Sequence, residues 1–306
     1  MDAEPKLKGY ILVAAVTVFF YDFLCTFPQE VAYVWSRPWS IGTVLFFLNR
    51  YLPFVDITLS LRLLTTISTP ERCFRRFMII AWFLAIGMAI SQLILLIRTY
   101  AMWHLKRSIT IFLFCLAFIT IIPGLVFAHM EAVSLEFRPV EGHRYGCNIV
   151  RARNIGIIAY IALFISETTI VILTMIKASQ HLRHSSSSSS WVFQLYRDGI
   201  IFYFYLLAMT IANAIVPVLA DFQYKGILAS PQRVLHSVLC TRVILVILRQ
   251  RSDIAQRNTT NSYSMSRNSQ QPRTEILTTI IDTRIDADID DSGEDLSRSI
   301  GRDWTS

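Results

Sequence analysis

The apolar positions of this chain gather in long continuous runs that short polar stretches separate. Seven such runs occupy residues 10–27, 41–64, 77–97, 109–130, 155–176, 200–220 and 227–248. A helix rises about 1.5 Å per residue and the bilayer core is about 30 Å thick, so roughly 20 apolar residues span it once. The pattern predicts an all-α membrane protein, a seven-transmembrane helix bundle.

The seventh run is the weakest of these predicted spans. It contains Pro231, Arg233, His236 and Arg242, and each Arg at the centre of a span costs about 2.5 to 3.5 kcal/mol. We expect this segment to insert only by packing against its neighbours. If it did not span, the protein would have six spans and the tail would lie on the other side.

Polar segments lie at both ends of the predicted bundle and in its fifth loop. Residues 1–9 form a short N-terminal tail, and residues 249–306 are polar and become acidic near the end. The tail cannot bury enough apolar surface to fold, so we expect it to be disordered. The fifth loop contains six consecutive serines, residues 185–190, typical of a flexible connector. We expect this loop and the tail to be available to a cytoplasmic partner.

Composition and charge agree with a membrane protein. The chain is 53% hydrophobic and 17% charged, compared with about 25% charged residues in soluble domains. Its net charge is +7, but the cations flank apolar runs, where snorkelling and anionic headgroups account for them. We therefore expect the lipid bilayer, and not nucleic acid, as the partner of this basic chain.

Five polar side chains interrupt the apolar runs at membrane depth: Asp22, Asn49, Arg50, Asp56 and Glu167. Such groups are costly in a bilayer and usually face the bundle interior in pairs. We predict that these residues form an intramembrane polar network. In the simplest interpretation, Asp22 or Asp56 neutralises Arg50 and clamps two helices together. The alternative is a functional role, such as lining a polar path.

The five cysteines divide by depth. Cys25, Cys115 and Cys240 lie inside apolar runs, where a thiol behaves as a small hydrophobic group. Cys73 and Cys147 lie outside them, on the same face in a seven-span arrangement. We predict a disulfide between these two on an oxidising face, the alternative being two unrelated thiols.

Orientation does not follow from the loop charges, because Lys and Arg are equally numerous on the two faces. We expect the N-terminus outside and the C-terminus in the cytosol, which places Cys73 and Cys147 where disulfides persist. The membrane would then be the plasma membrane or an endomembrane.

No catalytic constellation accompanies this architecture. The chain lacks a His cluster, a Ser/His/Asp set and paired carboxylates at catalytic spacing. His181 and His184 lack a third ligand nearby, so they are a weak metal signal. We expect no enzyme activity, no cofactor and no metal site.

Four stretches carry a resemblance to a known family. The first is YDFLCTFPQEVAYVWSRPWSIGTVLFFLNRYLPFVD, residues 21–56; the others are RTYAMW from Arg98, LYRDGIIFYF from Leu195 and PQRVLHSVLCTRVILVILR from Pro231. The first resembles the N-terminal signature of a large family of uncharacterised integral membrane proteins from mushroom-forming fungi. The resemblance implies a seven-helix membrane protein and supports the weak seventh span. It implies no activity, because the signature domain is itself of unknown function.

Two classes of function remain. A receptor-like sensor would share its layout with heptahelical receptors, although Arg98, Thr99 and Tyr100 stand where such receptors commonly have Asp-Arg-Tyr. The analogy operates at the level of the fold alone. A transporter or channel would use the polar residues at membrane depth as a path, but the chain shows no internal repeat of the kind common in transporters. Receptor-like sensing or signalling is the favoured interpretation.

Overall fold

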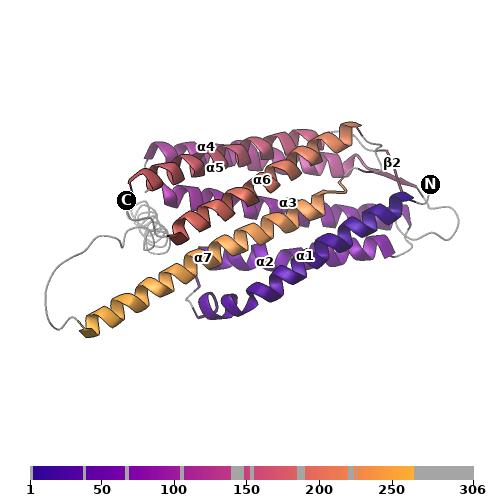
Figure 1. Ribbon diagram of the computed structural model, residues 1–306. Coiled ribbons are helices and arrows are strands. Elements are labelled where there is room, and N and C mark those ends of the chain that lie inside the picture. The colour runs from indigo at the N-terminus through magenta and orange to yellow at the C-terminus, as the bar shows by residue number, and fades with distance from the viewer. Residues whose placement is uncertain are drawn as a thin grey trace, which may run out of the picture.

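The computed structural model describes residues 3–36, 39–65, 69–103, 107–138, 148–151, 155–184, 190–219, 224 and 226–264. Within these residues the chain is almost entirely helical. Its seven described helices are α1 (Ala3–Tyr33), α2 (Ile41–Thr65), α3 (Pro70–Met102), α4 (Arg107–Val133), α5 (Gly156–His184), α6 (Ser190–Leu219) and α7 (Ala229–Ser264). They lie side by side in one elongated bundle (Figure 1).

Six of the seven described helices are long and apolar enough to cross a bilayer, namely α1, α2, α3, α4, α5 and α7. The helical membrane architecture predicted from the apolar runs is therefore confirmed. The described apolar part of α6 covers Tyr203–Leu219, and α7, which the sequence suggested would insert poorly alone, is among the six.

The helices extend beyond the apolar runs that predicted them. The largest difference is in α7, which continues past Leu248 to Ser264 and projects from the bundle (Figure 1). The boundary of the disordered tail predicted at residue 249 is therefore wrong for residues 249–264. Adding a residue to an existing helix costs far less than nucleating a new one, so a polar sequence can continue a packed helix. The remaining tail, residues 265–306, lies outside the described residues.

A short two-stranded sheet follows α4. Strand β1 (Glu136–Arg138) pairs antiparallel with β2 (Asn148–Arg151), and the register shifts between Glu136 and Phe137. The all-α prediction did not include this sheet, because strands this short leave no alternating pattern in the sequence. Phe137 lies with its ring centroid 5.9 Å from that of Phe77, so the sheet packs on the beginning of α3.

Exposure is distributed as expected for a protein whose solvent is lipid. Only 11% of the most apolar window of α4 is buried, and Ile111, Phe114 and Ile119 point outward. The corresponding window of α7 is 61% buried, although α7 carries the most polar residues in its span. Helices in lipid direct apolar side chains outward and polar ones toward each other. α7 therefore occupies the interior, where it packs against α1, α2, α3 and α6.

The main apolar core joins helices α3 to α7 in the half of the bundle away from the sheet. It includes Leu95, Leu116, Ile170, Leu206, Leu239 and Val243. Leu95 and Ile170 are completely buried. We call this cluster the apolar core below.

Candidate functional site

A cavity of about 380 Å³ lies at the end of the bundle that carries the β1–β2 sheet. Helices α3, α4 and α5 and the beginning of α7 supply most of its wall, and Lys8 of α1 and Phe137 of β1 also line it. Its lining runs along α5 from Gly156 to Ser166 and along α3 from Phe77 to Gln92. At about 1.5 Å per residue, these stretches correspond to a depth of about 15–22 Å. We call this cavity the sheet-end pocket.

The wall of the sheet-end pocket is mostly apolar, but its deepest layer is not. Apolar side chains cover the middle of the wall, among them Ile80, Leu84, Met88, Ile121, Leu125 and Leu163. The lining residue farthest from the sheet is polar and uncharged on each of α3, α4, α5 and α7: Gln92, Thr120, Ser166 and Gln232. Among the described lining residues, the only charged ones are Lys8 and Glu131, both near the sheet. The pocket thus has a neutral polar floor.

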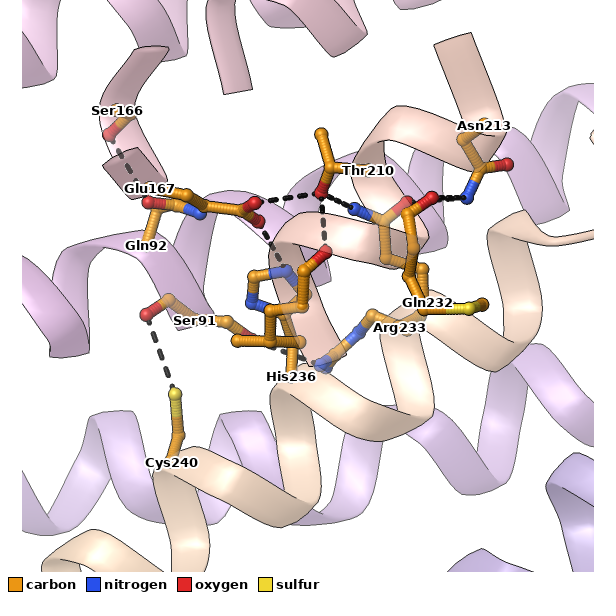
Figure 2. A network of polar contacts seen from close by, with 12 residues as sticks. Ser91, Gln92, Ser166, Glu167, Thr210, Asn213, Gln232, Arg233, His236 and Cys240 are labelled. Carbon is orange, nitrogen blue, oxygen red and sulfur yellow. Dashed lines mark hydrogen bonds and ion pairs between the residues drawn. The ribbon is translucent and has the colours of Figure 1, made fainter. Parts of the chain in front are cut away.

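A buried polar network continues from this floor (Figure 2). We define it as Glu167, Thr210, Asn213, Gln232 and His236. His236 Nε2 lies 2.8 Å from Glu167 Oε1, and Thr210 Oγ1 donates to Glu167 Oε2 at 2.7 Å. Gln232 Nε2 donates to Thr210 Oγ1 at 2.6 Å, and Asn213 Nδ2 donates to Gln232 Oε1 at 2.7 Å.

The network joins three helices to the pocket. Glu167 comes from α5, Thr210 and Asn213 from α6, and Gln232 and His236 from α7. Gln232 belongs to both the pocket floor and the network. Ser166, the neighbour of Glu167, also lines the floor and donates to Gln92 Oε1 at 3.3 Å. A group that displaced Gln232 would therefore disturb hydrogen bonds on α6 and α7.

A second cluster surrounds Arg233, whose side chain is completely buried. The Arg233 guanidinium donates to Ser91 Oγ at 3.1 Å and to the backbone carbonyl of Asn49 at 3.3 Å. Its Nε lies 3.9 Å from Asp56 Oδ2. Ser237 Oγ donates to the Asn49 carbonyl at 2.7 Å, so α7 is bonded to both α2 and α3. Asn49 and Asp56 thus belong to the same cluster and serve as partners of α7.

The partner of Arg50 is Glu30, not Asp22 or Asp56. Arg50 Nε lies 2.5 Å from Glu30 Oε2, and the two side chains are 2% and 0% exposed. Tyr51 Oη donates to Glu30 Oε1 at 2.8 Å. The predicted clamp between α1 and α2 therefore exists, but its carboxylate is Glu30, which lies beyond the first apolar run. Asp22 instead accepts a hydrogen bond from Arg242 Nε at 2.6 Å.

At the far end from the sheet, Arg98 of α3 donates from Nη1 to Tyr203 Oη of α6 at 2.9 Å. Both side chains are buried, with exposed fractions of 9% and 2%. Leu206 of the apolar core lies between Tyr203 and Thr210 on α6, and Ile170 of the apolar core follows Glu167 on α5, toward the far end. The polar network and the Arg98–Tyr203 bond are thus separated by apolar side chains.

All five residues predicted to lie at membrane depth are buried, with exposed fractions of 4% or less. They do not form one network: they divide among the Glu167–His236 network, the Arg233 cluster and two separate ion pairs. Sequence reasoning missed Glu30, Ser91, Thr210 and Gln232 and treated Arg233 and His236 only as a cost of insertion. A signal existed in α7, where polar residues recur every four positions in two rows: Gln232 and His236; and Arg233, Ser237 and Thr241.

Four of the five cysteines lie within the described residues. Cys73 is buried and disulfide-bonded, and Cys25, Cys115 and Cys240 are free. Cys147 lies outside the described residues, so its pairing with Cys73 stays a prediction. Among the described residues, no group of three His, Cys, Asp or Glu side chains is arranged to hold a metal ion.

Comparison with known proteins adds one match. The chain matches a family of unknown function (DUF6533) over residues 10–55, which cover most of α1 and the first part of α2. This stretch holds Asp22, Glu30, Asn49 and Arg50, each of which bonds to another helix or clamps α1 to α2. No curated protein and no solved structure matches the chain. The wider resemblance to fungal membrane proteins stays a prediction.

Proposed function

We propose that this chain is a seven-helix membrane receptor that binds a ligand in the sheet-end pocket and responds through α6 and α7. One observation carries the proposal: the floor of the pocket shares Gln232 with the buried polar network. A ligand that bonds to Gln232 would compete with Thr210 and Asn213 for its side chain. The equilibrium between two arrangements of α6 and α7 would then depend on ligand.

The far end of the bundle offers an element that such a shift could move. The Arg98–Tyr203 bond joins α3 to α6 on the side away from the pocket. If α6 moved, this bond would break and release α6 from α3 at this end of the bundle. The serine-rich loop between these helices, of which residues 185–189 lie outside the described residues, connects directly to them. It and the tail are the segments through which we expect a cytoplasmic partner to bind.

A transporter is the second candidate, and the Glu167–His236 pair favours it. The pair lies directly beyond the pocket floor, where a proton could pass between a carboxylate and an imidazole. The apolar core argues for the receptor instead, because it separates the network from the Arg98–Tyr203 end. A transporter must open its site to both sides of the membrane in turn, whereas a receptor pocket opens to one side.

The side of the membrane from which the pocket can be reached distinguishes a receptor from a transporter, and cysteine labelling measures it. Ala128→Cys places a thiol in the pocket wall, and Ser179→Cys places one on exposed α5 near the far end. Both would be made with the exposed Cys25 and Cys115 replaced by Ser. A membrane-impermeant maleimide is then added to either side of vesicles in which the protein has one orientation.

The receptor predicts that Ala128→Cys reacts only from the sheet side and Ser179→Cys only from the other. Reaction of Ala128→Cys from both sides would establish alternating access and favour the transporter. Glycosylation in cells tests the orientation of the protein. We propose that the sheet side and the N-terminus are outside, so an N-glycosylation acceptor engineered into the loop between β1 and β2 should be glycosylated in cells, and Asn258 of α7 should not.

A further inference from the structure

We propose that the sheet-end pocket binds an uncharged amphiphile, a molecule with a long apolar body and one neutral hydrogen-bonding group such as a hydroxyl or an amide. The inference rests on the proposed function, because it names the class of ligand that the receptor would recognise.

The apolar body follows from the shape and composition of the wall. The pocket is about 380 Å³ in volume, within the usual range for small-molecule sites. Its lining extends about 15–22 Å along α3 and α5, and Leu84, Met88 and Leu125 are among the side chains in the middle. An elongated apolar molecule would remove this lining from water, and each buried CH₂ group contributes favourably to binding.

The hydrogen-bonding group follows from the floor. Gln92, Thr120, Ser166 and Gln232 bring amide and hydroxyl groups from four helices to one depth. Gln92 is 4% exposed, and its Nε2 has no hydrogen-bond partner among the described residues. A buried donor without an acceptor is costly. After a small rotation of the Gln92 side chain, a ligand hydroxyl or carbonyl oxygen could accept from it.

The absence of charge follows from the neighbours of the floor. The nearest ionisable groups beyond it, Glu167 and His236, are already paired with each other, and Arg233 faces Asp56. A carboxylate or an ammonium group at the floor would meet no described counter-charge that is not already engaged. An unpaired charge is very costly at a site shielded from water. The floor therefore selects against ions of either sign.

The test uses the full chain in phosphatidylcholine nanodiscs and a diazirine derivative of dodecanol as the probe. After illumination, mass spectrometry locates the modified peptides. We expect modification of the α3, α4 and α5 residues that line the pocket. Dodecanol, dodecanoate and dodecylammonium, which share one chain and differ in the head group, are then added as competitors. We expect dodecanol to compete at a concentration at least about tenfold lower than either ion.

Two matched variants separate the pocket from the lipid-facing surface. Gly124 lines the pocket and has no atom within 4 Å of the position of an added Cβ, so Gly124→Leu begins in open space and reduces the cavity volume. Gly42 is the control. It is exposed near the beginning of α2, does not line the pocket, and an added Cβ there meets only Ser40 Oγ at 3.8 Å. Gly124→Leu should abolish pocket labelling, and Gly42→Leu should leave it unchanged.

A variant of Gln92 tests the hydrogen bond between the pocket floor and the head group of the ligand. Gln92→Met keeps the length of the side chain and removes its hydrogen-bonding groups. We expect it to weaken competition by dodecanol and leave competition by dodecane unchanged. Lipid extracted from the purified protein identifies the source: a neutral lipid that the probe displaces comes from the bilayer, and an empty pocket that takes up the probe indicates a ligand from outside it. Either result supports an uncharged amphiphile.

Competition and labelling test the ligand class, whereas cysteine access tests the receptor, so the two proposals can fail separately. If dodecanoate or dodecylammonium competes as well as dodecanol, or Gln92→Met changes nothing, the ligand class is wrong and the pocket is still a ligand site. If labelling avoids the pocket and is insensitive to Gly124→Leu, the inference is overturned. Access of Ala128→Cys from both sides of the membrane would overturn the receptor whatever the probe binds.

Discussion

His236 Nε2 lies 2.8 Å from Glu167 Oε1, and the two side chains are 0% and 1% exposed. The pair joins α5 to α7 inside the bundle, where neither partner can turn to water. Removing one partner from a buried pair usually costs about 3–5 kcal/mol, because the other stays buried without compensation.

We therefore expect Glu167→Leu and His236→Leu each to lower stability by about that amount, and the double variant to recover most of it. A double-mutant cycle based on unfolding in mixed micelles measures the coupling free energy. Additive losses would mean that the two side chains act independently.

Two Arg–carboxylate ion pairs differ in exposure and provide a matched comparison. Glu30 and Arg50 are almost completely buried, whereas the Arg242 side chain that pairs with Asp22 is 44% exposed. Glu30→Gln should destabilise the protein by about 3–5 kcal/mol. Asp22→Asn should cost less, because the partly exposed Arg242 side chain can extend along α7 toward the lipid headgroups. Thermal unfolding of the two variants in the same detergent tests whether Glu30→Gln loses more stability than Asp22→Asn. Equal losses of stability would contradict this prediction.

Gly87 of α3 leaves the space that Arg233 occupies. A Cβ at this position would overlap the Arg233 guanidinium. Gly87→Ala should therefore displace Arg233 from Ser91 and cost about 1–3 kcal/mol. Gly124→Ala is the control, because nothing lies within 4 Å of its added Cβ and alanine is the better helix former. It should leave stability unchanged or raise it.

Tyr203 and Tyr205 of α6 differ in their surroundings. Tyr203 accepts a hydrogen bond from Arg98, whereas Tyr205 is 61% exposed. Tyr203→Phe should cost about 1.5–3 kcal/mol, the usual contribution of a hydrogen bond to a charged group, and accelerate hydrogen exchange at the beginning of α6. Tyr205→Phe should change neither. If both variants behave alike, the bond to Arg98 does not hold α6 to α3.

The disulfide of Cys73 gives a prediction about connectivity. If Cys147 is its partner, Cys73→Ser and Cys147→Ser should each lower stability by about 2–4 kcal/mol, and the double variant should lose no more than either. Peptide mapping without reduction identifies the bond directly. A peptide that joins Cys73 to any other cysteine would refute the predicted pair.

The positions of the helices could be predicted because the bilayer requires long apolar runs. Such runs are recognised from the hydropathy of each residue alone, without knowledge of its tertiary contacts. The structure places the predicted segment 41–64 at Ile41–Thr65. The partner of Arg50 could not be predicted in this way. Glu30 follows the end of the first apolar run at residue 27, yet α1 continues to Tyr33 and carries it to the level of Arg50. Helix length beyond the apolar run depends on packing, which a hydropathy profile does not contain.

The role of α7 was underestimated for a related reason. Arg233 and His236 reduce the hydropathy of the segment, so they indicate a poor span when α7 is considered alone. Their partners Ser91 and Glu167 lie on helices far away in sequence. The repeat of polar residues at every fourth position was the available signal, because it places them on one side of the helix. Which helices would face that side could not be known without the tertiary structure.

The central position of α7 has a consequence for biogenesis. Ribosomes synthesise the chain from its N-terminus, so α7, which completes the interior, is the last of the seven described helices to leave the exit tunnel. Until it arrives, α2, α3 and α5 present Asn49, Ser91 and Glu167 without the α7 groups that they later bond. Unsatisfied polar groups are costly in lipid. The six-helix nascent chain is thus an unstable intermediate, and a chain truncated before residue 229 would be a substrate for membrane quality control.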